Sequence, residues 1–301
     1  MNRMRKFRFV LKSADQDPRI LYSILERLSV LNKFIITPIR QRFSTIWVTR
    51  DQLEKWADDW KFFFILGFGR SGTTFMANFL NRAEGAHVFH EPVLEDFYAH
   101  FRAHYNSNAA KRYMQGFRKK EIYFRMRQDA PGVYGEVNGN LRCHSNAIRL
   151  AFPRVALLHL VRDGRDVVRS AMPRWVMTIR NPLSLMIRPE AGDPCKSRWH
   201  EMDRFSRICW YWQEENQRLR TSIGKTVQFE KILSSYEYFQ SQVLEPCGIH
   251  IEKKVWQAAI SIPRNTTSEF SMPRWDQWTP EQQKTFREIC GKEMAQCGYD
   301  I

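Results

Sequence analysis

The sequence of 301 residues has no pair of cysteines at a redox or metal-binding spacing. Its six cysteines are scattered, without a C-x-x-C pair or the Cys/His spacing of a zinc site. A chain of this length buries enough apolar surface to fold without disulfide bonds. We therefore expect reduced thiols and a cytoplasmic location, with a Cys290–Cys297 bridge as the alternative left open.

The chain also lacks a long uninterrupted apolar run. Residues 1–12 are basic and lack the apolar core of a secretory signal. Residues 20–39 are more apolar, but three charged residues interrupt them, so they make a poor membrane span. We expect residues 1–58 to form a basic helical extension on a catalytic domain at 59–301, with contact to a membrane surface as the lesser alternative.

Acidic residues are fewer than basic ones. The 32 Asp and Glu are outnumbered by 47 Lys and Arg, which gives a net charge of +15. Such a surface favours an anionic partner, but charge alone does not choose among nucleic acid, lipid, acidic glycan and nucleotide.

Short apolar runs, most of them with few charges, predict a buried parallel sheet. The runs at 62–66, 155–161 and 226–229 are the clearest strands, and those at 86–89 and 133–137 are weaker. Helical patterns separate them, which indicates an α/β, doubly wound, three-layer fold with a central parallel sheet flanked by helices. Thr279, Pro280 and Gln282 predict the start of a C-terminal helix, and 181–197 is the best candidate for an irregular lid.

A glycine-rich turn follows the first strand. The sequence GFGRSGTT at 67–74 nearly matches the P-loop G-x-x-x-x-G-K-[ST], but threonine replaces the lysine. Backbone N–H groups at the start of a helix, an arginine and several hydroxyls still make an oxyanion site. The candidate ligands are Arg70, Ser71, Gly72, Thr73 and Thr74. Without the lysine, and without a later aspartate to hold Mg²⁺, a nucleoside triphosphatase is the lesser reading.

A second anion site is predicted at the end of a later strand. The sequence VALLHLVRDGRDVVRS at 155–170 runs from a buried strand through a tight turn into a helix. Arg162 and Ser170 can then face the same crevice above the strand ends. A charged fork and a hydroxyl together suit a terminal phosphate.

The two motifs in this order resemble the sulfotransferases that use 3′-phosphoadenosine 5′-phosphosulfate (PAPS). The likeness covers roughly residues 60–300. It implies a P-loop-like fold, with the loop at 70–74 on the 5′-phosphosulfate and with Arg162 and Ser170 on the 3′-phosphate. Asn265 and Thr266 lie where such enzymes often return a loop to the nucleotide. A donor with one anhydride and no γ phosphate needs neither the lysine nor a metal.

The resemblance also points to a catalytic base. Many carbohydrate-type and bacterial relatives carry Glu-Pro after the second strand, so Glu91 is the first choice and His90 the second. Small-molecule relatives instead use a histidine after the third strand, and the stretch YGEVNGNLR at 134–142 departs from that pattern. Glu136 and Asn138 are predicted either to orient the acceptor or to support the core.

Three functions stay open on the sequence alone. The leading one is transfer of a sulfuryl group from PAPS to a hydroxyl or amine acceptor, which is a small molecule or a glycan; a carbohydrate is one candidate. The second is a P-loop kinase that lost its lysine. The third is a non-enzymatic module that binds nucleic acid or acidic glycan and shows steep salt dependence; the leading reading expects no nucleic-acid partner, and the oligomeric state is left open.

Overall fold

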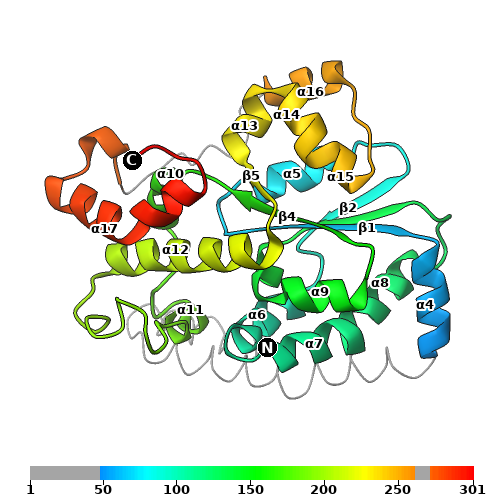
Figure 1. Cartoon of the computed structure of the whole chain (residues 1–301), viewed down its shortest axis with the longest axis horizontal. Helices are drawn as coiled ribbons and strands as arrows, with labels where there is room; N and C mark the ends of the chain where they lie inside the picture. The colour runs from blue at the N-terminus through cyan, green and yellow to red at the C-terminus, as the bar shows by residue number, and fades with distance from the viewer. Residues whose placement is uncertain (1–47, 262–271) are drawn as a thin grey trace, which may run out of the picture.

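The computed structural model describes residues 48–261 and 272–301 (Figure 1). The strands are β1 Lys61–Gly67, β2 Ala86–His90, β3 Val133–Val137, β4 Ala156–Val161 and β5 Thr226–Gln228. The α-helices are α4 Arg50–Asp58, α5 Thr73–Leu80, α6 Glu95–Tyr105, α7 Ser107–Tyr113, α8 Lys119–Met126, α9 Ser145–Ala151, α10 Gly164–Ala171, α11 Pro182–Met186, α12 Arg204–Ile223, α13 Phe229–Ser234, α14 Tyr236–Phe239, α15 Glu245–Cys247, α16 Lys253–Ile260 and α17 Pro280–Gln296. The 3₁₀-helices are η3 Gly139–His144 and η5 Trp275–Gln277, and the π-helical turns are η2 Met114–Arg118 and η4 Gln240–Leu244.

The five strands form one parallel sheet in the order β2-β3-β1-β4-β5. Each predicted strand is present, which confirms the α/β fold with helices on both faces of a central parallel sheet. The chain moves to one side of β1 to build β2 and β3 and then returns to the other side for β4 and β5. In sheets of this kind ligands bind outside the carboxyl ends of the strands at such a change of direction, which here lies between β1 and β4.

Apolar side chains fill both faces of β1. Phe63 and Ile65 pack with α5, α13, α14 and α16, whereas Phe62 and Phe64 face the side covered by α8, α9 and α12. Figure 1 shows these two helical layers above and below the sheet. Because β1 is buried on both faces, its sequence reads as a continuous apolar run instead of an alternating one.

The fifth strand ends one residue earlier than predicted. It pairs with β4 only from Thr226 to Gln228, opposite His159 to Val161. Beyond Val161 the neighbouring strand offers no further ladder, and Phe229 begins α13 instead. The C-terminal helix is confirmed, with Thr279 and Gln282 forming a reciprocal capping box ahead of α17.

The region beside the carboxyl edge of the sheet holds a third apolar cluster. Trp210 and Trp212 of α12 are buried there: Trp210 packs edge-on against Trp199, and Trp212 lies beside Gly164 at the start of α10. The segment 181–197 is largely irregular and contains the short helix α11. The structure describes all six cysteines, and each is a free thiol.

Within the described ranges, no helix is both long and apolar enough to span a bilayer. The last part of the predicted extension, α4, packs on α8: Trp56 makes an edge contact with Tyr123, and Lys119 pairs with Glu54. The basic residues 1–12, the apolar stretch 20–39, Asn265 and Thr266 lie outside the described residues.

Candidate active site

The turn after β1 is built for close approach by an anion. Gly72 has φ 86°, and a Cβ on it would lie 2.3 Å from Cε2 of Phe229. Only glycine therefore fits this position, both for conformation and for space. Arg70 also adopts a left-handed conformation, with φ 75°. The turn leads directly into α5, so the first N–H groups of that helix point back toward the loop.

One buried hydroxyl in the turn has no partner among the described residues. Ser71 is fully buried, and its Oγ finds no hydrogen-bond acceptor or donor among the described residues. Buried polar atoms are seldom left unpaired, since that costs about 1–3 kcal/mol. An oxyanion bound in the loop would supply the missing partner.

The two predicted anion sites meet in space. Arg70 Nε donates to Ser170 Oγ at 2.9 Å, and Arg162 Nη1 donates to the backbone oxygen of Arg70 at 3.3 Å. Arg70 comes from the loop after β1, Arg162 directly follows β4, and Ser170 lies on α10. The motifs are about ninety residues apart in sequence, yet they form one site.

This site carries concentrated positive charge. Burial, followed by the neighbouring cations Arg174 and Arg162, lowers the pKa of the Arg70 guanidinium. Mutual repulsion of this kind is relieved when a multivalent anion binds. Arg174 was not identified from the sequence, because a single arginine shortly after α10 has no distinctive pattern around it.

Arg162 is held in place by acidic and aromatic neighbours. Its Nη2 donates to Asp166 at 3.2 Å, its Nε lies 4.0 Å from Glu230, and its guanidinium lies over the Phe229 ring at 5.7 Å. Arg165 is instead engaged by Asp163 through three hydrogen bonds. Of these two arginines, Arg162 is the one that contacts Arg70 in the loop after β1.

His90, the last residue of β2, reaches the phosphate loop. Its Nε2 lies 3.0 Å from Thr73 Oγ1 and 3.3 Å from Thr74 Oγ1. A single ring nitrogen can bond one hydroxyl as donor or as acceptor, depending on the tautomer. His90 thus organises the two threonine hydroxyls at the start of α5.

Glu91 directly follows β2, and its side chain reaches the segment just beyond β3. It has φ 43°, an uncommon conformation for a residue other than glycine. Its Oε1 accepts a hydrogen bond from the Gly139 amide at 3.2 Å. A Cβ on Gly139 would lie 2.9 Å from Glu91 Oε1 and 3.1 Å from the oxygen of Gly67, so the carboxylate is closely packed there. Strained backbone that is held by tight packing is common at functional sites.

Glu136 and Asn138 lie in a buried network of carboxylates and one arginine. The Asn138 amide donates to Glu136 and to Asp96, both at 2.9 Å, and Arg118 contacts the same two carboxylates. Burial raises the pKa of Asp96 to about 7, against the opposing effect of Arg118. Of the two predicted roles, core support is the one this arrangement matches.

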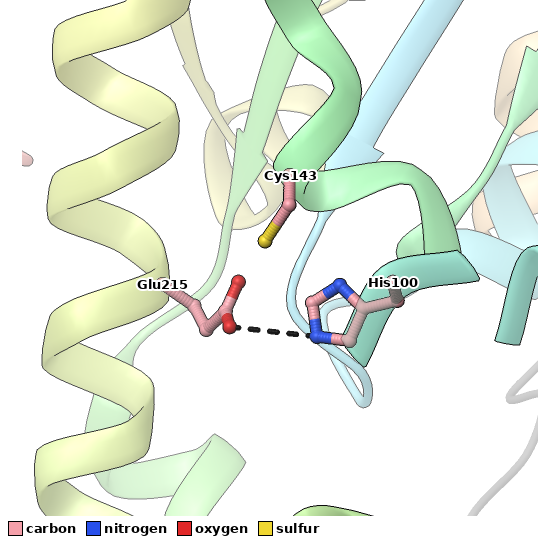
Figure 2. A group of neighbouring side chains, drawn as sticks. All are labelled: His100, Cys143 and Glu215. Atoms are coloured by element: carbon pink, nitrogen blue, oxygen red, sulfur yellow. Dashed lines mark ion pairs between the residues drawn. The ribbon is translucent and has the colours of Figure 1, made fainter. Parts of the chain in front are cut away.

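A group of potential metal ligands lies nearby. His100, Cys143 and Glu215 bring one ligand atom each within 4.8 Å of one another, and Figure 2 shows the His100 and Glu215 side chains facing across the gap. However, Arg142 donates to Glu215 at 3.0 Å and to His100 Nε2 at 3.1 Å. A cation here would have to displace a guanidinium, so the group is an ionic network in this structure.

Comparison with known proteins places the chain in one family. A sequence model of the Sulfotransferase family matches residues 63–253, more than half of the chain. The search of curated proteins returned no match.

One similar solved structure is a sulfotransferase from Alicyclobacillus acidocaldarius. It is 16% identical, the match covers 79% of this chain and 96% of that chain, and the TM-score is 0.42. Sulfotransferase STF9 from Mycobacterium avium has 12% identity, 83% and 82% coverage, and a TM-score of 0.46. The sulfotransferase domain from the Curacin biosynthetic pathway has 13% identity, 80% and 99% coverage, and a TM-score of 0.46. On the family match over residues 63–253, the chain belongs to the sulfotransferase family.

Proposed function

We propose that the protein transfers a sulfuryl group from PAPS to a hydroxyl or amine of a small molecule or glycan. The observation that carries the proposal is the contact of Arg70 with both Ser170 and Arg162 at the carboxyl ends of β1 and β4. A donor with a 5′-phosphosulfate and a 3′-phosphate offers two anionic ends to these two adjoining motifs.

The residues have separable roles in this reaction. Arg70, the orphaned hydroxyl of Ser71, and the amides around Gly72 would bind the 5′-phosphosulfate. Arg162 and Ser170 would bind the 3′-phosphate. Asn265 is proposed as a further nucleotide contact on the resemblance alone.

The chemistry needs a proton acceptor and a stabilised leaving oxygen. The acceptor oxygen forms a bond to sulfur, the bond from sulfur to the bridging oxygen breaks, and 3′-phosphoadenosine 5′-phosphate leaves. Glu91 would take the acceptor's proton, with His90 as the alternative base. The hydroxyls of Thr73 and Thr74, both within reach of His90, would face the charge that develops on the bridging oxygen.

The lost lysine is consistent with a donor that has no γ phosphate, so we propose a reaction without a metal. The domain division at residue 58 and a cytoplasmic location are part of the same proposal. Contact of the basic N-terminus with a membrane surface is also part of this proposal.

The test is transfer of sulfur-35 from labelled PAPS to fractionated acceptors, with and without EDTA. Labelled product that persists under chelation supports the proposal. Phosphoryl transfer from ATP that requires Mg²⁺, with no sulfur-35 in any product, would favour the kinase alternative instead.

A further inference from the structure

Arg142 is a buried cation whose guanidinium is hydrogen-bonded at each of its three nitrogens. It lies on η3, and its Nε donates to Glu215 Oε2 at 3.0 Å. Its Nη2 lies 2.9 Å from the Tyr211 hydroxyl and 3.1 Å from His100 Nε2. Its Nη1 donates to the backbone oxygen of Gly139. The guanidinium fork is therefore engaged on every side.

Glu215 balances this charge inside the protein. Burial raises the pKa of the Glu215 carboxyl, but the Arg142 charge outweighs it and holds the pKa well below the usual range. Burial and the Arg142 charge lower the pKa of His100, which stays neutral and accepts from the guanidinium. Arg142 and Glu215 thus form an ion pair with a fixed orientation, which we call the clamp.

Gly139 links this clamp to the proposed base. Arg142 holds the carbonyl of Gly139, and the amide of the same residue donates to Glu91 Oε1 at 3.2 Å. The glycine is held between the two side chains, and no side chain larger than hydrogen fits beside Glu91 without displacement.

Arg142 also contacts the phosphate loop. Its guanidinium lies 5.3 Å from the ring centroid of Phe68, the first residue after β1. Phe68 in turn makes an edge contact with Tyr211 at 5.0 Å, and Tyr211 accepts from Arg142. One buried side chain therefore touches both the loop proposed to bind the donor and the residue that holds the proposed base.

We propose that Arg142 is a positioning residue, which fixes the Glu91 carboxylate relative to the phosphate loop by holding Gly139. The inference rests on the proposed role of Glu91. Lysine cannot replace the clamp, because an ammonium has three donors on one atom whereas the guanidinium directs five N–H groups from a rigid plane.

The test uses two variants that disturb the clamp from different ends. Arg142→Lys keeps the charge and loses the fork, while Gly139→Ala leaves Arg142 intact and pushes against Glu91. Each should lower kcat about 10–100-fold, since a misplacement of about 1 Å at the reacting centre has that effect. The Kd for 3′-phosphoadenosine 5′-phosphate should stay within about twofold of the parent value. Gly116→Ala is the matched control, because a Cβ there meets nothing within 4 Å.

A readout independent of turnover separates this inference from the proposed function. In protein labelled with ¹⁵N-glycine, the Gly139 amide resonance should move as Glu91 ionises, and Glu91→Gln should abolish that movement. In Arg142→Lys the movement should shrink at least about twofold, because the amide is no longer held against the carboxylate. Gly139→Ala identifies the resonance by removing it.

Three results are decisive. Parent kcat in both clamp variants, together with a large loss in Glu91→Gln, would overturn the inference and leave the proposed function standing. Parent kcat in Glu91→Gln would overturn the role of Glu91 and the inference with it. If the movement of the Gly139 amide resonance is the same in Glu91→Gln and Arg142→Lys as in the parent, the inference is overturned whatever the activity.

Discussion

Arg162→Ala should weaken binding of a 3′-phosphorylated nucleotide selectively. In the free protein the Arg162 guanidinium already donates to Asp166 at 3.2 Å and lies 4.0 Å from Glu230. An incoming phosphate therefore competes with two carboxylates. A charged hydrogen bond contributes about 1.5–3 kcal/mol; with this competition we expect the lower part of that range, about 1.5–2 kcal/mol, or roughly ten- to thirtyfold in Kd.

The assay is calorimetric titration with 3′-phosphoadenosine 5′-phosphate and with adenosine 5′-phosphate, which lacks the 3′-phosphate. Only the first ligand should lose affinity. Arg165→Ala is the control, because Asp163 engages that guanidinium, and its Kd should change by less than about twofold. Asp166→Asn should strengthen binding by removing a competitor. Equal weakening of both ligands in Arg162→Ala would refute the assignment.

Three further predictions concern the base, the loop and the response to pH. Glu91→Gln should lower turnover about 10²–10⁴-fold with donor affinity kept, and His90→Gln should lose less; steady-state kinetics with a dead His90→Gln and a near-normal Glu91→Gln would exchange the roles. Gly72→Ala should destabilise the fold by about 2–5 kcal/mol in urea unfolding, from the left-handed φ and the aromatic ring carbon 2.3 Å from the new Cβ, and an unchanged midpoint would contradict this. Burial lowers the pKa of His159 to about 4, so the unfolded chain binds its proton first and stability should fall by about 2 kcal/mol between pH 7 and pH 5; His159→Gln should lose this part of the pH dependence, and an unaltered slope would argue against it.

β1 and β4 were the most predictable strands because they are short apolar runs buried on both faces. Val155 to Val161 and Phe62 to Leu66 carry little besides apolar side chains, and each leads into a turn. The strand order was not predictable, since it depends on which side of β1 each crossover takes. The early end of β5 at Gln228 follows from where the neighbouring strand stops, which its own sequence does not record.

In the site, too, the local motifs were predictable and the contacts between distant segments were not. The motifs predicted two anion-binding segments, but the hydrogen bond between Arg70 and Ser170 is a tertiary contact across one hundred residues. Arg142 carried no local signal, because its partners Glu215 and Tyr211 come from a different helix. Arg174 joins the charged site by position alone.

Binding of 3′-phosphoadenosine 5′-phosphate to the unmodified protein, measured by thermal shift in EDTA beside ATP with Mg²⁺ and an oligonucleotide, decides between sulfuryl transfer and its alternatives. Two adjoining anion sites that need no metal predict that the 3′-phosphorylated nucleotide raises Tm in EDTA. Adenosine 5′-phosphate should raise it less at equal concentration. Stabilisation by ATP with Mg²⁺ or by the oligonucleotide, with no response to 3′-phosphoadenosine 5′-phosphate, would contradict a PAPS-dependent sulfotransferase.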